Sequence, residues 1–83
     1  MFQVEFSKKA DRQLNKLPIE LQKRIIIYLE RIRIRPFHYV KKLQGTPYYR
    51  VRVGEYRIIL DIQENKLIVF ILEIGHRRNI YKN

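Results

Sequence analysis

The sequence predicts an α+β domain in which two helices lie against one face of a small, mainly antiparallel sheet of four strands. Three observations lead to this prediction. Apolar and polar residues alternate over residues 2–6 and 48–60, apolar residues recur at helical spacing over 8–33, and they form a nearly continuous run over 67–74. The expected order is strand, helix, helix, strand, strand, strand, in a single domain of residues 1–83.

The first strand and the first helix follow from residue spacing. Residues 2–6 (FQVEF) alternate apolar with polar side chains, which is typical of a strand with one buried face. Ser7 comes next and can cap a helix, because its hydroxyl accepts a hydrogen bond from an amide that the first turn leaves unpaired. The apolar positions of this helix are Ala10, Leu14 and Leu17. Pro18 then ends it.

A longer helix is expected from Ile19 to about Arg33, and Pro36 ends it. Its core-facing positions are Leu21, Ile25, Tyr28, Leu29 and Ile32. Three further apolar residues make the stripe wider than one contact requires: Ile26, Ile27 and Ile34. We therefore expect this helix to contact both the sheet and the first helix, or else a partner protein.

Residues 48–60 (YYRVRVGEYRIIL) predict a β-hairpin, because the side chains alternate on both sides of a glycine-led turn. Glycine in the first position of a two-residue loop favours a type II′ turn at Gly54 and Glu55. Such a turn pairs Val53 with Tyr56, Arg52 with Arg57, Val51 with Ile58 and Arg50 with Ile59. Three arginines, at positions 50, 52 and 57, then share the face that the helices leave open.

This arginine face has two explanations. Like charges directly across a strand pair cost from a few tenths to about 1 kcal/mol, so folding alone does not favour them. The first explanation is a solvated surface on which arginine stems cover apolar neighbours. The second is a binding site for a polyanion, because guanidinium forks match phosphate oxygens and keep their charge.

The chain after the hairpin contains one more strand. Residues 67–74 (LIVFILEI) are almost continuously apolar, which predicts a strand covered on both faces near the middle of the sheet. Gly75 ends this run, and residues 76–83 form a basic tail. Upstream of the hairpin, residues 37–47 show no clean period, and Gly45 with Pro47 indicates a turn.

The composition indicates a basic globular protein. The formal net charge is +10 and the pI is about 10.2, which favours a nucleic acid or an acidic protein as partner. The chain has no cysteine, which excludes disulfides and thiolate sites and fits a reducing compartment. No apolar run approaches the roughly 18 residues of a spanning helix, so we expect a cytoplasmic protein that does not enter a membrane.

The motifs of most enzyme classes are missing. The two histidines have no metal-ligand partner at a useful spacing, Ser7 is the single serine, and the three glycines form no phosphate loop. We therefore expect no metal ion and no cofactor. Arginine, tyrosine and histidine suffice for one reaction, because RNA can be cut by its own 2′-hydroxyl if a protein holds the phosphate in line and neutralises its charge. The arginines that can do so are Arg50, Arg52, Arg57 and Arg77, while Tyr81 and His76 can stack on bases or transfer protons.

The chain resembles the RelE/ParE superfamily of toxin–antitoxin toxins, and within it the RelE mRNA interferases. The resemblance spans nearly the whole length, in the stretches FQVEFSKKADRQLNKL, KKLQGTPYYRVRVGEYRIIL and LEIGHRRNIY. It implies a ribosome-dependent endoribonuclease that cleaves mRNA in the A site and inhibits translation. It also implies an acidic RelB-like antitoxin, bound to the toxin in a hetero-oligomer.

The resemblance further implies roles for individual residues. Arg50 and Arg52 stand where the family places basic residues around the scissile phosphate, and well-studied members carry lysines there. Arg57 corresponds to a stabiliser of the transition state, Arg77 to the arginine after the last strand, and Tyr81 to a tyrosine that stacks on the mRNA base. We expect further RNA contacts from Lys41, Lys42 and Arg78. The general base stays open, because arginine is essentially never deprotonated in proteins.

Two other functions remain open at this stage. A ParE-like toxin would share the fold and inhibit DNA gyrase without cleaving RNA. A degenerate toxin would bind RNA or its antitoxin and have no catalytic activity.

Overall fold

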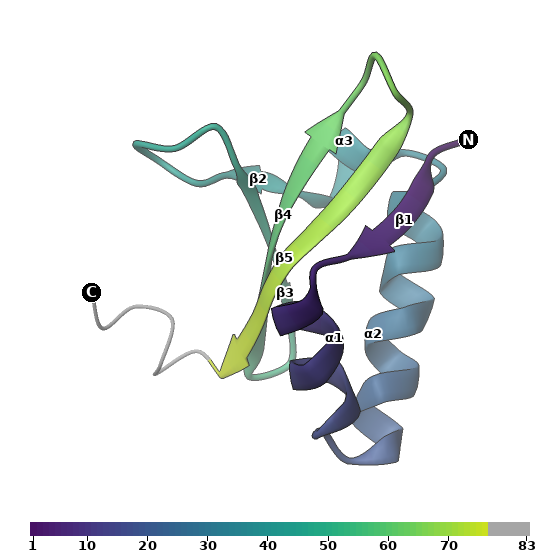
Figure 1. Ribbon diagram of the computed structural model, residues 1–83, viewed down its shortest axis with the longest axis vertical. Coiled ribbons are helices and arrows are strands. Elements are labelled where there is room, and N and C mark those ends of the chain that lie inside the picture. The colour runs from purple at the N-terminus through teal and green to yellow at the C-terminus, as the bar shows by residue number, and fades with distance from the viewer. Residues whose placement is uncertain (77–83) are drawn as a thin grey trace.

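The computed structural model describes residues 1–76, which form a five-stranded sheet with helices packed against it (Figure 1). The elements are β1 (Gln3–Phe6), α1 (Lys8–Asn15), α2 (Ile19–Ile32), α3 (Pro36–Tyr39), β2 (Lys41–Lys42), β3 (Tyr49–Val53), β4 (Tyr56–Gln63) and β5 (Ile68–His76). The strands lie in the order β1-β5-β4-β3-β2. The predicted α+β class and the predicted order of the main elements are confirmed.

The sheet differs from the prediction in two respects. It has five strands within residues 1–76, because β2 adds a two-residue edge strand that is too short to show a period in the sequence. It is also mixed, since β1 runs parallel to β5, with Gln3 opposite Ile68 and Phe6 opposite Ile71. β1 is followed by helices and not by a tight turn, so it joins the sheet beside the last strand instead of pairing with its neighbour in sequence.

Hydrogen bonds of the cap residue Ser7 and of Gln13 attach α1 to β5. The backbone N–H of Ala10 donates to Ser7 Oγ at 3.0 Å, so Ser7 is the helix cap that the sequence predicts. The Ser7 hydroxyl in turn donates to the carbonyl of Leu72 at 2.8 Å. Further along the helix, Gln13 Oε1 accepts from the backbone N–H of Ile74 at 2.7 Å. α1 therefore satisfies the edge of β5 beyond the point where β1 ends.

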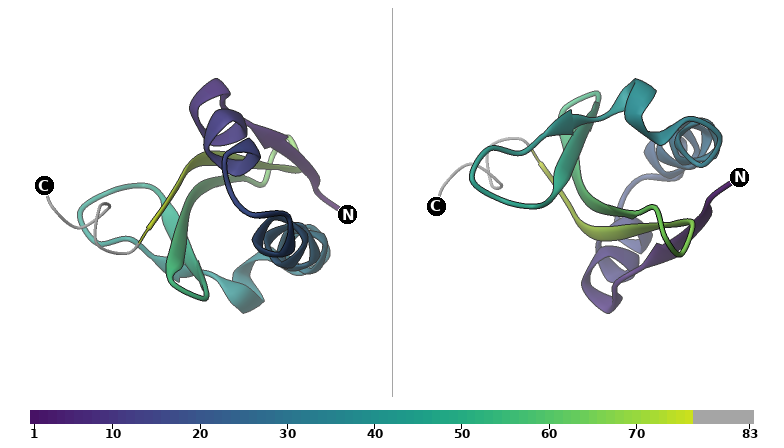
Figure 2. Two further views of the ribbon diagram at one scale, coloured as in Figure 1. Left: turned by 90° about the horizontal axis from the view of Figure 1, so that it is seen from below. Right: turned by 90° about the horizontal axis from the view of Figure 1, so that it is seen from above.

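One apolar core joins the helices to the sheet. α1 contributes Ala10 and Leu14, α2 contributes Ile25, Leu29 and Ile32, and the strands contribute Val51, Val53, Ile58, Leu60, Val69, Ile71 and Ile74. Burying one such aliphatic side chain stabilises the fold by about 1.5–3 kcal/mol. Figure 2 shows α2 inside the curve of the twisted sheet, so we call the opposite face of the sheet the outer face.

Two apolar surfaces are less covered than a fully packed core would be. Ile26, Ile27 and Ile34 are exposed in the single chain, so they are not part of the core. β5 lies inside the sheet as predicted, but Phe70 and Leu72 on its outer face are half-buried. On its core-facing side, by contrast, Val69, Ile71 and Ile74 are buried. In residues 1–76, no helix has both the length and the apolar character needed to cross a membrane.

Replacing Ile71 with alanine should destabilise the protein by about 2–5 kcal/mol, because Ile71 is fully buried and a cavity would remain. Ile27→Ala is the matched control, since Ile27 is exposed on α2 and its loss should cost about 0.5 kcal/mol or less. Urea unfolding followed by circular dichroism measures both. Equal losses for the two variants would contradict this description of the core.

Candidate functional site

The β3–β4 hairpin has the predicted register. Val53 lies opposite Tyr56, Arg52 opposite Arg57, Val51 opposite Ile58 and Arg50 opposite Ile59. Gly54 has a φ of 61°, and Glu55 is not among the described residues with positive φ, as a type II′ turn requires. The hairpin prediction is therefore confirmed pair by pair.

This register brings the three arginines of the hairpin to the outer face. Directly opposed residues of an antiparallel pair point to the same side, and Val51 and Val53 between the arginines point into the core. Arg52 is exposed, and its Nε donates to the Gly54 carbonyl at 3.2 Å, which holds the guanidinium beside the turn. Arg50 is half-buried.

Arg57 is far less open than the sequence predicts. Its exposed fraction is 8%, the same as that of Ile59 on the same strand. The reason is that β4 is an interior strand, whose outer-face side chains lie between those of β3 and β5. A cation in such surroundings acts strongly on a neighbouring charge, because less water screens it.

The two lysines of β2 lie on different faces of the sheet. Lys41 lies opposite Arg50 and therefore joins the arginines on the outer face. Lys42 lies opposite Tyr49, and its Nζ sits 4.8 Å from the centroid of the Tyr49 ring. Of the two lysines predicted to contact RNA, Lys41 is thus the one that the structure brings to the arginines.

A cavity of about 380 Å³ lies where these cations meet the helices. It is lined by Tyr28, His38, Tyr39, Lys41, Arg50, Val51, Arg52 and Arg57, and we call it the β3-edge cavity. β2 pairs with Tyr49 and Arg50 of β3. The part of β3 that leads to the turn therefore has no neighbouring strand on that side, and this edge lies beside α2 and α3. The volume falls in the range of small-ligand sites, about 300–1,000 Å³.

The helical side of the β3-edge cavity is aromatic. The ring centroids of His38 and Tyr39 are 4.9 Å apart at 81°, and those of Tyr39 and Tyr28 are 6.4 Å apart at 79°. Sequence reasoning missed His38 and Tyr39, because their segment has no period. The available signal was local: three ring-bearing residues at 37–39 are followed by two lysines at 41 and 42, shortly before the hairpin.

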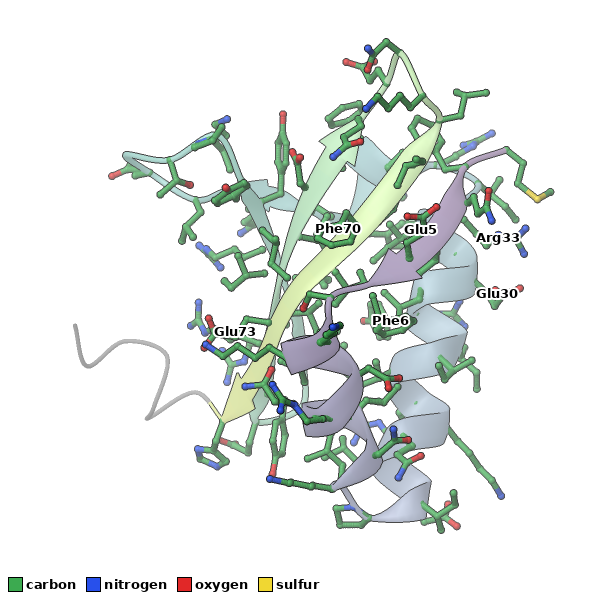
Figure 3. The ribbon with its side chains drawn as sticks, viewed as in Figure 1. Glu5, Phe6, Glu30, Arg33, Phe70 and Glu73 are labelled. Carbon is green, nitrogen blue, oxygen red and sulfur yellow. The ribbon has the colours of Figure 1, made fainter. Side chains whose placement is uncertain are left out.

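The charge of the β3-edge cavity is positive. None of the described residues that line it is acidic, and four of them are cationic. Glu73 of β5 lies opposite Ile59 on the outer face, where it forms an ion pair with Lys9 at 3.4 Å. A second ion pair, between Glu30 of α2 and Arg33 directly after that helix, lies at the other side of the molecule (Figure 3). The arrangement can bind a phosphate group, because its guanidinium and ammonium groups converge on one space.

Among the remaining predicted site residues, His76 is described and does not line this cavity. His76 lies opposite Tyr56, with the two rings 5.3 Å apart at 79°, and the register places both on the side of Val53, opposite to Arg57. Arg77, Arg78 and Tyr81 lie outside the described residues. Within residues 1–76, no three histidine, aspartate or glutamate side chains come together as ligands for a metal ion.

Comparison with known proteins finds relatives over nearly the whole chain. Residues 4–81 match the family model of the ParE toxin of the type II toxin–antitoxin system parDE. A curated relative from Methanocaldococcus jannaschii, named as toxin RelE1, is 30% identical over 87 residues, which cover 99% of this chain and 97% of that protein.

Solved structures share the fold over similar lengths. The toxin–antitoxin complex RelBE2 of Mycobacterium tuberculosis contains a chain that is 26% identical, with a TM-score of 0.84, covering 92% of this chain and 98% of that one. The archaeal RelE–RelB complex of Pyrococcus horikoshii contains a chain that is also 26% identical, with a TM-score of 0.82, covering 94% and 97%.

Replacing Arg50 or Lys41 with glutamine should weaken the binding of a single-stranded RNA oligonucleotide. Each lost phosphate contact should lower the slope of log affinity against log salt by about 0.7. Fluorescence anisotropy at several salt concentrations measures this slope. Lys66→Gln is the control, since Lys66 is exposed in the turn between β4 and β5 and does not line the cavity. An equal effect of all three variants would indicate that charge alone, without a site, attracts RNA.

Proposed function

The chain belongs to the RelE/ParE superfamily of toxins of type II toxin–antitoxin systems, and from this premise we propose that it is an endoribonuclease that cleaves mRNA in the ribosomal A site. One observation carries the proposal. Arg50, Arg52 and Arg57 share a cavity in which no described lining residue is acidic. A site that stabilises a highly charged phosphate needs such convergence of cations.

The proposed reaction is an attack within the RNA. The 2′-oxygen forms a bond to the adjacent phosphorus, the bond from phosphorus to the 5′-oxygen breaks, and a 2′,3′-cyclic phosphate results. Arg50 and Arg52 would hold the phosphate in line with the attacking oxygen. The reacting atoms would then be kept in the one geometry that allows the attack. Arg57, at the base of the cavity, would stabilise the extra negative charge on the phosphate oxygens in the transition state.

Groups other than the arginines have to transfer the protons of this reaction. The 2′-hydroxyl loses a proton and the 5′-oxygen gains one, and arginine keeps its proton throughout. His76 lies on the face opposite to Arg57, so the proposed reaction does not use it. Arg77 as a further source of positive charge and Tyr81 as a stacking residue stay proposals from the family resemblance, as does Arg78 as an RNA contact.

We also propose an acidic RelB-like antitoxin as partner, in a hetero-oligomer. Two similar chains occur in RelBE2 and RelE–RelB complexes, and a net charge of +10 favours a partner of the opposite sign. The exposed isoleucines of α2 offer an apolar surface for the same partner: Ile19, Ile26 and Ile27. The ribosome and mRNA are the proposed targets, and they place the activity in the cytoplasm.

A second function is favoured by the family model, whose description names ParE. A ParE-like protein would inhibit DNA gyrase. A supercoiling assay separates the two functions: inhibition of gyrase at low protein concentration, with mRNA left intact on ribosomes, would replace the nuclease proposal by this one.

Arg57→Gln should reduce cleavage of mRNA on programmed ribosomes by about 100- to 1,000-fold, the usual effect of removing one charge-stabilising group from a transition state. The cleavage rate is measured by primer extension, and circular dichroism checks that the fold is kept. Arg12→Gln serves as the control, because Arg12 is exposed on α1 and does not line the cavity. Intact A-site mRNA with the unaltered protein would overturn the nuclease proposal. Growth arrest unaffected by Arg57→Gln would indicate a degenerate toxin.

A further inference from the structure

We propose that the aromatic side of the β3-edge cavity binds a nucleobase, beside the phosphate that the arginines hold. This inference rests on the proposed function, because it assumes that the ligand is RNA. It assigns His38 and Tyr39 a role that the family resemblance does not supply.

The two sides of the cavity match the two parts of a nucleotide. The strand side presents the guanidinium and ammonium groups of Arg50, Arg52 and Lys41, which suit a phosphate. The helical side presents the rings of His38 and Tyr39, which suit the face of a base. A simple phosphate site would need the first side alone. A cavity of about 380 Å³ with both sides suits a nucleotide.

The three rings on the aromatic side form a row that runs from Tyr28 on α2 to His38. Tyr28 is half-buried on α2, and the guanidinium carbon of Arg31 lies 5.8 Å from its ring centroid. Tyr39 is half-buried and contacts Tyr28 and His38 edge to face. His38 is exposed at the end of this row. The ring that meets a base is therefore His38, and Tyr39 fixes its orientation.

The distance between the base side and the phosphate side is set by a separate aromatic contact. Phe37, next to His38, packs on Tyr49 with ring centroids 5.6 Å apart at 71°. Tyr49 is next to Arg50 on β3. Pro36 is buried at the start of α3, where its ring fixes the backbone. The short helix is thus attached to the strand that carries the arginines, so the two sides present a fixed spacing to the RNA.

Two small probes separate base binding from phosphate binding. Adenosine 5′-monophosphate and ribose 5-phosphate carry the same sugar and phosphate and differ in the base. In an NMR titration of the full chain, we expect the first to bind about 5- to 100-fold more tightly, as for bases that stack on aromatic side chains, and to shift the ring signals of His38 and Tyr39. Equal affinities would overturn the inference.

A matched pair of variants assigns the effect to the ring. His38→Phe keeps an aromatic face and should keep the preference for adenosine 5′-monophosphate, whereas His38→Leu removes the face and should abolish it. Both changes are at an exposed position, so neither should unfold the protein. Equal behaviour of the two variants would overturn the inference, whether both keep the preference or both lose it, since the ring would then not be the cause.

Cleavage on programmed ribosomes separates this inference from the proposed function. If the unaltered protein cleaves mRNA, His38→Leu should slow cleavage at low toxin concentration and His38→Phe should not. If cleavage is unaffected by His38→Leu, the base site is wrong and the nuclease proposal stands. If the unaltered protein does not cleave, the nuclease proposal fails, and the titration alone decides whether a base binds beside Tyr39.

Discussion

The two-residue turn at Gly54 and Glu55 fixes which side of β3 and β4 faces the core, and both the core and the site depend on it. Side chains along a strand alternate with a period of two, so a slip of one residue would exchange the faces. Val51 and Val53 would then leave the core, and Arg50 and Arg52 would enter it. The glycine φ of 61° is what allows so short a connection.

The same register imposes unfavourable contacts that the fold has to tolerate. It opposes Arg52 to Arg57 and Lys41 to Arg50, and each such pair costs from a few tenths to about 1 kcal/mol. The aliphatic core on the other side of the strands offsets this cost. The Lys9–Glu73 ion pair engages the carboxylate that lies opposite Ile59 on the outer face. Because Glu73 is paired with Lys9, the positive charges of the cavity remain available to a ligand.

Local patterns in the sequence predicted the parts of the fold that depend on neighbours in the chain. The hairpin pairs, the Ser7 cap and the buried positions of α2 belong to this group. The parallel pairing of β1 with β5 could not be predicted, because it joins segments more than sixty residues apart and leaves no local period. For the site, the hairpin arginines and Lys41 were predicted, but His38 and Tyr39 were not, since α3 is a single turn whose importance lies in what it packs against.

The pairing of Gln3 with Ile68 also has a consequence for biosynthesis. A chain emerges from the ribosome with its amino end first, so β1 has to wait for β5 before it can find its place. Contacts between distant segments slow folding, because the closure of a long loop precedes any gain. The final sheet therefore forms late, once the residues up to His76 have left the exit tunnel.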